Sequence, residues 1–165
     1  MDAIFTRTSV RNYESRPVED EKIGKILRAA MAAPSAMNQQ PWEFYVVTNK
    51  STLRQLSEAS PYAGMTAEAP AALVLCYRKT DIKVPELVDV DMSLATENIL
   101  LEIEALGLGG VMLGIAPFEE RMAKVAKALD LPEQLAVFTV VPFGYPTKKN
   151  PQQDRYDESR VHYVR

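Results

Sequence analysis

Residues 86–106, ELVDVDMSLATENILLEIEAL, form the longest helical pattern of the chain and constrain its fold more than any other segment. The apolar positions of this predicted helix are too numerous for one narrow stripe. They are Leu94, Ile99, Leu100, Leu101, Ile103 and Leu106. We expect a left-handed cap at Gly107 to end the helix. Because the helix is apolar on two sides, it is either the central helix of its domain or part of a subunit interface.

The segments around this helix alternate between helical and strand patterns. The predicted helices cover residues 17–33, 50–60 and 118–130, and the first of them has one apolar face. The predicted strands are rich in β-branched and other apolar residues and cover residues 42–48, 71–78, 109–115 and 135–144. Asn49 or Ser51 is expected to cap the helix that begins at residue 50. The spacing differs from that of regular βαβ units, so we predict a single α+β domain over residues 1–165, with one mixed sheet and helices on both faces.

The chain changes character after Gly144. Residues 145–165 contain two prolines, many charges and almost no core-forming pattern. This tail is too long and too polar to belong to the same core, so it is either disordered or packed on another surface. Its end, RVHYV, has the alternation of an edge strand.

The composition argues against several classes of function. The chain has 19 basic and 22 acidic residues, and this balance disfavours general nucleic-acid binding. The single cysteine, Cys76, lies in a buried-strand pattern and is expected to be an inert core thiol, not part of a disulfide or a metal cluster. His162 is the only histidine, which leaves little material for a zinc site or a Ser-His-Asp triad.

Acidic residues also limit the metal and membrane hypotheses. Asp89 and Asp91 stand two positions apart on a predicted helix and therefore point to different faces, so we reject them as metal ligands. The most apolar stretch of the chain is interrupted by Glu102 and Glu104, which makes a membrane span unfavourable. No signal peptide is visible, and the expected location is the cytoplasm.

The stretch RTSVRNY, residues 7–13, has the side chains that a phosphate site needs. Arg7 and Arg11 supply positive charge, and Thr8 and Ser9 supply hydroxyl donors. A solvated helix face would show the same two arginines at helical spacing. The stretch alone does not decide between these two interpretations.

Two further stretches combine polar or glycine residues with possible ligand contacts. PSAMNQQPW, residues 34–42, offers hydroxyl and amide groups that suit the edge of a heteroaromatic ring, although an ordinary polar connector has the same composition. LGLGGVMLGIAP, residues 106–117, holds four of the seven glycines. These glycines allow either a flat ligand to lie against the backbone or a helix to pack on the strand, and they form neither a P-loop nor GxGxxG.

The combination of these stretches is more specific than any one of them. RTSVRNY, PSAMNQQPW, LGLGGVMLG and the tail's QDR occur in the order seen in the nitroreductase family of FMN-dependent oxidoreductases. The sequence resembles the shorter members of this family over almost its whole length. The resemblance implies a three-layer α/β/α fold with a mixed, mainly antiparallel sheet. It also implies a homodimer in which residues 145–165 wrap around the partner subunit.

The resemblance further implies a set of FMN contacts. The residues expected at the phosphate, the ribityl chain and the pyrimidine edge are Arg7, Thr8, Ser9 and Arg11. Those expected to reach the flavin from the neighbouring subunit are Pro34, Ser35, Ala36 and Asn38. Those expected beside the ring and its N5 atom are Met112, Leu113 and Gly114. Arg155 is expected to close over the phosphate.

The sequence also departs from the family pattern. Ala36 stands where a second serine is common, and Gln153 stands where a basic residue is frequent. Lys148 or Lys149 could replace that missing charge. Residues 60–70 match no family contact and are expected, by position only, to line the substrate cleft.

The implied activity is hydride transfer from NAD(P)H through flavin N5 to an electron-poor acceptor such as a nitroaromatic or a quinone, in ping-pong order. No catalytic side chain is expected, because the cofactor carries the chemistry and Arg11 supplies charge near the pyrimidine edge. A non-catalytic or repurposed flavin-binding homodimer is the alternative. A purely structural dimer would leave the polar groups of PSAMNQQPW without a purpose.

Overall fold

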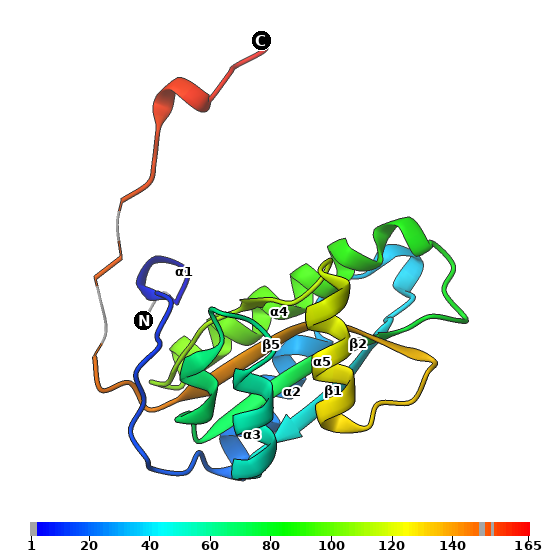
Figure 1. The fold of residues 1–165 in the computed structure, drawn as a ribbon. Helices are drawn as coiled ribbons and strands as arrows, with labels where there is room; N and C mark the ends of the chain where they lie inside the picture. The colour runs from blue at the N-terminus through cyan, green and yellow to red at the C-terminus, as the bar shows by residue number, and fades with distance from the viewer. Residues whose placement is uncertain (1–2, 149–150, 153) are drawn as a thin grey trace.

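A computed structural model describes residues 3–148, 151–152 and 154–165. In these residues one antiparallel sheet lies between two layers of helices (Figure 1). Its strands run in the order β1 (Trp42–Val47), β2 (Ala71–Arg78), β5 (Leu135–Gly144) and β3 (Gly109–Gly110), and β4 (Leu113–Gly114) also pairs with β5. A parallel contact is made only by an isolated bridge between Ser9 and Gly110, as far as the chain is described.

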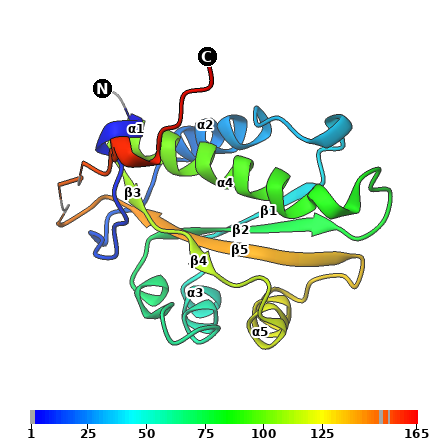
Figure 2. The same ribbon diagram turned by 90° about the horizontal axis from the view of Figure 1, so that it is seen from above.

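The helices divide between the two faces of the sheet. Figure 2 shows α2 (Asp20–Met31) and α4 (Val88–Ala105) on one face and α3 (Lys50–Ser57) and α5 (Glu119–Leu129) on the other. The short helix α1 (Ala3–Thr6), which no sequence pattern predicted, lies beside α4. The single-turn helices are Ala36–Asn38, Gly64–Ala67, Pro85–Leu87 and Glu158–Arg160. The predicted three-layer α/β/α fold is confirmed.

Strand β2 shows why the middle of the sheet is apolar throughout. Its residues alternate between the two helical layers, as the two-residue period of a strand requires. Leu73 and Leu75 belong to the core under α2 and α4, whereas Val74 and Cys76 belong to the core under α3 and α5. Burial raises the pKa of the Cys76 thiol to about 12, which confirms that Cys76 is a core thiol.

The two apolar sides of helix α4 differ in their burial. Met92, Ile99 and Ile103 are buried in the core beneath α2 and α4. Leu94, by contrast, is 40% exposed and Val90 is 51% exposed. One apolar side therefore serves the domain core, and the other remains uncovered in a single chain.

The prediction of one continuous strand over residues 109–115 is wrong. The structure has two short strands, β3 and β4, and the interruption lies opposite Pro142 of β5. Val111 N–H donates to the Pro142 carbonyl at 3.3 Å, but proline has no N–H to return a hydrogen bond. The ladder therefore breaks at Val111 and Met112 and resumes at Leu113.

The predicted edge strand in RVHYV is also wrong. The described part of the tail contains no strand, and its regular element is the turn of helix Glu158–Arg160. The Asp157 carboxylate stabilises this turn by accepting hydrogen bonds from Ser159 N at 3.1 Å and from Arg160 Nε at 2.9 Å. The end of the tail, from Glu158 on, extends away from the domain, so no sheet edge of its own chain is beside it (Figure 1).

Two predicted helix boundaries are confirmed. The Asn49 carboxamide accepts hydrogen bonds from the backbone N–H groups of Ser51 and Thr52 and so caps α3. Gly107 follows α4 with a φ of +74°, the left-handed conformation that ends a helix. Along the described part of the chain, no helix is long and apolar enough to cross a membrane.

Candidate cofactor and substrate site

The segment after α1 runs along the glycine-rich edge of the sheet. Val10 N–H donates to the Gly110 carbonyl at 3.0 Å, and the Val10 side chain is 2% exposed. This close approach depends on Gly109, because a Cβ at that position would lie 2.6 Å from Val10 Cγ2. Residues 7–13 are not helical, so the interpretation of RTSVRNY as a solvated helix face is wrong.

Tyr13 fixes the end of this segment to the sheet. Its hydroxyl oxygen lies 2.7 Å from the Val10 carbonyl oxygen and 3.0 Å from the Pro142 carbonyl oxygen. Burial raises the pKa of Tyr13 above its usual range, against a smaller lowering by the charge of Arg11. The phenol therefore stays neutral and keeps its proton for these carbonyls.

The fixed segment forms one wall of a polar hollow of about 350 Å³. The residues that line it are Arg7, Thr8, Ser9, Arg11, Pro151, Gln152 and Arg155. The structure therefore brings the predicted tail arginine to the predicted N-terminal arginines. Three guanidinium groups with two hydroxyl groups are a donor set that suits a phosphate.

The charges around this hollow are partly compensated. Arg7 Nε lies 3.7 Å from Glu97 Oε1 on α4, and the Arg7 side chain is 24% exposed. Lys148 is exposed and is not among the described residues that line the hollow. Gln153 and Lys149 lie outside the described residues.

A second hollow of about 320 Å³ adjoins the first, since Arg11 lines both. Its other lining residues are Tyr62, Met65, Val111, Met112, Leu113 and Gly114. The structure thus places the three residues expected beside the flavin ring in one hollow. It also brings Tyr62 and Met65 there, from the segment 60–70 that we expected to line the substrate cleft.

Arg121, at the start of α5, contacts Gly114 of this hollow, and sequence reasoning missed this contact. Its Nη1 donates to the Gly114 carbonyl at 2.7 Å, and its guanidinium lies 4.0 Å from the centre of the Phe118 ring. These contacts hold the exposed end of β4. No sequence signal identifies them, because they depend on how the chain turns between β4 and α5.

The two hollows together fit FMN by the chemistry of their side chains. The polar hollow offers guanidinium and hydroxyl donors for a phosphate, and the adjoining hollow offers apolar side chains and strand backbone for a flat ring. Arg11 stands at their junction. The order of these groups matches a ligand with an anionic end and an aromatic end.

The predicted contacts Pro34, Ser35, Ala36 and Asn38 lie elsewhere in the chain. Their loop is held near the start of α4, where Ala36 N–H donates to Asp91 Oδ1 at 2.8 Å. Figure 2 shows this connection between α2 and β1 at the end of the domain away from α1 and β3. Within one chain the structure therefore does not bring these residues to Arg7 and Arg11.

Gln39, one of the amide side chains of PSAMNQQPW, forms its hydrogen bonds within its own chain. It is 6% exposed, and its Nε2 donates to Asp91 Oδ2 at 2.7 Å. Its Oε1 accepts from Val84 N–H at 2.9 Å. Asp91 is 2% exposed and Asp89 is exposed, as expected for acids on different faces of α4.

The loop has an unusual backbone. Met37, Asn38 and Gln40 have φ values of 48°, 52° and 44°, a left-handed conformation that costs a non-glycine residue about 1–3 kcal/mol. Contacts from several elements maintain it. Lys83 Nζ donates to the Met37 carbonyl at 3.3 Å, and Gln40 N–H donates to Ser35 Oγ at 3.0 Å.

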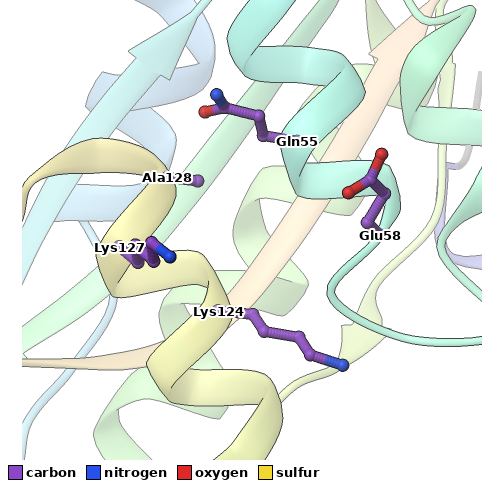
Figure 3. Close-up of a pocket in the computed structure, with 5 residues that line it drawn as sticks. All are labelled: Gln55, Glu58, Lys124, Lys127 and Ala128. Carbon is purple, nitrogen blue, oxygen red and sulfur yellow. The ribbon is translucent and has the colours of Figure 1, made fainter.

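A third hollow, of about 450 Å³, lies between α3 and α5. Figure 3 shows Gln55 on α3, Glu58 directly after α3, and Lys124, Lys127 and Ala128 on α5 around it. Lys124 Nζ pairs with Glu120 at 2.8 Å. None of these lining residues belongs to the other two hollows, and the polar side chains of this hollow, Gln55, Glu58, Lys124 and Lys127, are exposed and form no constellation for catalysis.

The sequence profile of the nitroreductase family matches residues 4–80 and 60–145. The chain belongs to this family. A nitroreductase-family protein of Archaeoglobus fulgidus, provisionally named NADH dehydrogenase/NAD(P)H nitroreductase, is 45% identical over 96% of this chain and 94% of its own length.

Solved structures agree with this membership. A provisionally named NADH oxidase from Clostridium acetobutylicum has a TM-score of 0.95 and 44% identity, and the match covers 99% of both chains. A provisionally named nitroreductase from Desulfovibrio desulfuricans, solved in complex with FMN, has a TM-score of 0.84 and 25% identity over 99% of this chain and 95% of its own.

Proposed function

We propose that this protein is an FMN-dependent oxidoreductase that takes reducing equivalents from NAD(P)H. The observation that carries the proposal is the pair of adjoining hollows, in which three guanidinium groups stand next to an apolar site with Arg11 at the junction. Membership in the nitroreductase family and the FMN complex of a relative support the same cofactor.

The residues divide the work of binding between them. Arg7, Arg11 and Arg155 would neutralise the phosphate, with hydrogen bonds from the Thr8 and Ser9 hydroxyl groups. Bound FMN would supply the redox chemistry by accepting a hydride from NAD(P)H and passing it to an acceptor. Arg11 would place positive charge where negative charge develops, and the apolar hollow would exclude water.

We further propose that the active unit is a homodimer. Leu87, just before α4, and Val90 and Leu94 on α4 have helical spacing and are 42%, 51% and 40% exposed, which leaves an apolar row uncovered at the start of this helix. The loop 34–38 lies away from the hollows of its own chain. A partner subunit on this row would bring Pro34, Ser35, Ala36 and Asn38 to the neighbouring flavin and give residues 145–165 a surface to wrap around.

The final acceptor is proposed to be a nitroaromatic or a quinone. Both substrates would use the one hollow lined by Tyr62, Met65 and Met112, so they would bind in turn and give ping-pong kinetics. No side chain is assigned as a general acid or base.

An anaerobic titration tests the proposal. Protein reconstituted with FMN should lose its yellow colour when NADH or NADPH is added, and a quinone or nitroaromatic should restore the colour. Parallel lines in double-reciprocal plots should then report the ping-pong order. Binding without bleaching would instead identify the non-catalytic flavin-binding alternative, and absence of FMN binding would refute both.

A further inference from the structure

The buried carboxylate of Asp91 holds the loop 34–40 against α4. Its two oxygens accept hydrogen bonds from Ala36 N–H at 2.8 Å and from Gln39 Nε2 at 2.7 Å. The Gln39 side chain also forms two hydrogen bonds with the backbone of Val84. Its Oε1 accepts from Val84 N–H, and its Nε2 donates to the Val84 carbonyl oxygen at 3.2 Å. The loop is thereby fixed to α4 and to the segment before it.

An apolar residue in place of Asp91 would leave the Ala36 N–H and the Gln39 Nε2 without these acceptors, so the carboxylate maintains a loop conformation that the chain would otherwise lose. The loop that Asp91 holds has its outer side chains in solvent, since Met37 is 70% exposed and Asn38 is exposed. The hydrogen bonds from Asp91 to Ala36 and Gln39, here called the clasp, therefore hold in place a surface that is not packed against its own domain.

We propose that Asp91 is a positioning residue for the cofactor. Its carboxylate holds the loop so that Asn38 is presented in one orientation to the flavin of the partner subunit. This inference rests on the proposed function, in which the loop 34–38 reaches that flavin. Asp91 itself acts only through the loop and touches neither cofactor nor substrate.

Asp91→Asn tests the inference with little change in volume. The carboxamide oxygen introduced by this substitution can still accept from Ala36 N–H, but its NH₂ group would face the Gln39 amide, so two donors would meet. A half-turn rotation of the Gln39 carboxamide would remove this clash, but it would place the NH₂ group against Val84 N–H and the oxygen against the Val84 carbonyl, so both hydrogen bonds to Val84 would be lost. We expect the FMN dissociation constant, measured by quenching of flavin fluorescence, to rise about tenfold, as for one lost hydrogen bond to a charged group.

A double-mutant cycle separates positioning from general destabilisation. Asn38→Gly removes the presented side chain and tolerates the left-handed backbone. If Asp91 acts through Asn38, then Asp91→Asn should raise the FMN dissociation constant by clearly less in the Asn38→Gly background than in the wild type. An equal rise in both backgrounds, or no rise in the wild type, would overturn the inference.

Further variants keep the test decisive. Asp89→Asn, on the exposed side of the same helix, is the matched control and should leave FMN affinity unchanged. If Asp91→Asn does not fold, Gln39→Met breaks the same clasp and takes its place in the cycle. Arg7→Ala reports on the proposed function separately, since its failure to weaken FMN binding would count against the phosphate site and not against the clasp.

Discussion

Val10 packs directly on the backbone of Gly109, at a distance that no residue with a side chain would allow. A Cβ at Gly109 would stand 2.6 Å from Val10 Cγ2 and 2.7 Å from Val10 Cβ. This contact holds the N-terminal segment 7–13 against β3, next to the hollow lined by Val111, Met112 and Leu113. We therefore expect the arrangement of the two hollows to depend on glycine at position 109.

We predict that Gly109→Ala displaces the segment 7–11 and weakens FMN binding. The added methyl group must push Val10 aside, and overpacking of this kind costs about 1–3 kcal/mol of unfolding free energy. Chemical denaturation and FMN titration measure the two effects. Gly24→Ala is the control, because nothing lies within 4 Å of the Cβ there and alanine favours a helix. Similar behaviour of the two variants would contradict the prediction.

Arg7 and Arg11 should have separable effects. Arg7→Ala removes a phosphate contact and should weaken FMN binding by about 1.5–3 kcal/mol, whereas the flavin midpoint potential should change little. Arg11→Ala should weaken binding and also make the midpoint potential more negative, because Arg11 lines the ring hollow as well. Arg28→Ala, on the exposed surface of α2, is the control. Identical midpoint potentials in both site variants would contradict the electrostatic role of Arg11 beside the flavin ring.

Glu19 should make the thermal stability depend on pH at low pH. The hydrogen bond from the Tyr145 hydroxyl, with a further contribution from Arg16, lowers the pKa of Glu19 from 4.5 to about 2. A lowered carboxyl pKa means that the stabilisation is present above the unfolded pKa and is lost as the pH falls through 4.5 towards 2. We expect the melting temperature of Glu19→Gln to fall less than that of the wild type over this range. Parallel curves for the two proteins would refute the assignment.

Thr66→Val should stabilise the protein. Thr66 is fully buried, and its hydroxyl oxygen has no hydrogen-bond partner in the described structure. Valine has the same shape without the polar group, so the gain should be about 1 kcal/mol of unfolding free energy. Thr66→Ser, which keeps the hydroxyl and removes a methyl group, should destabilise the protein in the same denaturation assay. A destabilised valine variant would show that the hydroxyl is satisfied.

Local sequence patterns were sufficient for most elements of the fold. Strand β2 is apolar at every position up to Cys76 because both faces of the sheet are covered, and this covering is visible as an unbroken apolar run. Gly107 and Asn49 are read correctly because capping depends on neighbours in the chain. The break at Val111 was not predicted, because it depends on Pro142, which is distant in sequence and opposite in the sheet.

The candidate site shows the same division. Arg7, Arg11, Met112 and Gly114 were identified from stretches whose order resembles the nitroreductase family, yet only the sheet places the N-terminal segment beside β3 and β4. Arg121 and the inward turn of Gln39 were missed. Hydrogen bonds between distant segments leave no periodic signal, since a polar residue looks the same in sequence whether it faces solvent or a buried partner.

The amino-acid sequence by itself determined most of the helices and strands, the caps at Asn49 and Gly107, and which stretches carry charge or glycine. Periodicity and capping are local, so they need no knowledge of the fold. The tertiary structure decided that Arg155 joins Arg7, that Asp91 holds Gln39 and that β3 and β4 are separate strands. These outcomes depend on which distant surfaces meet, and only the packing of the two helical layers on the sheet determines that.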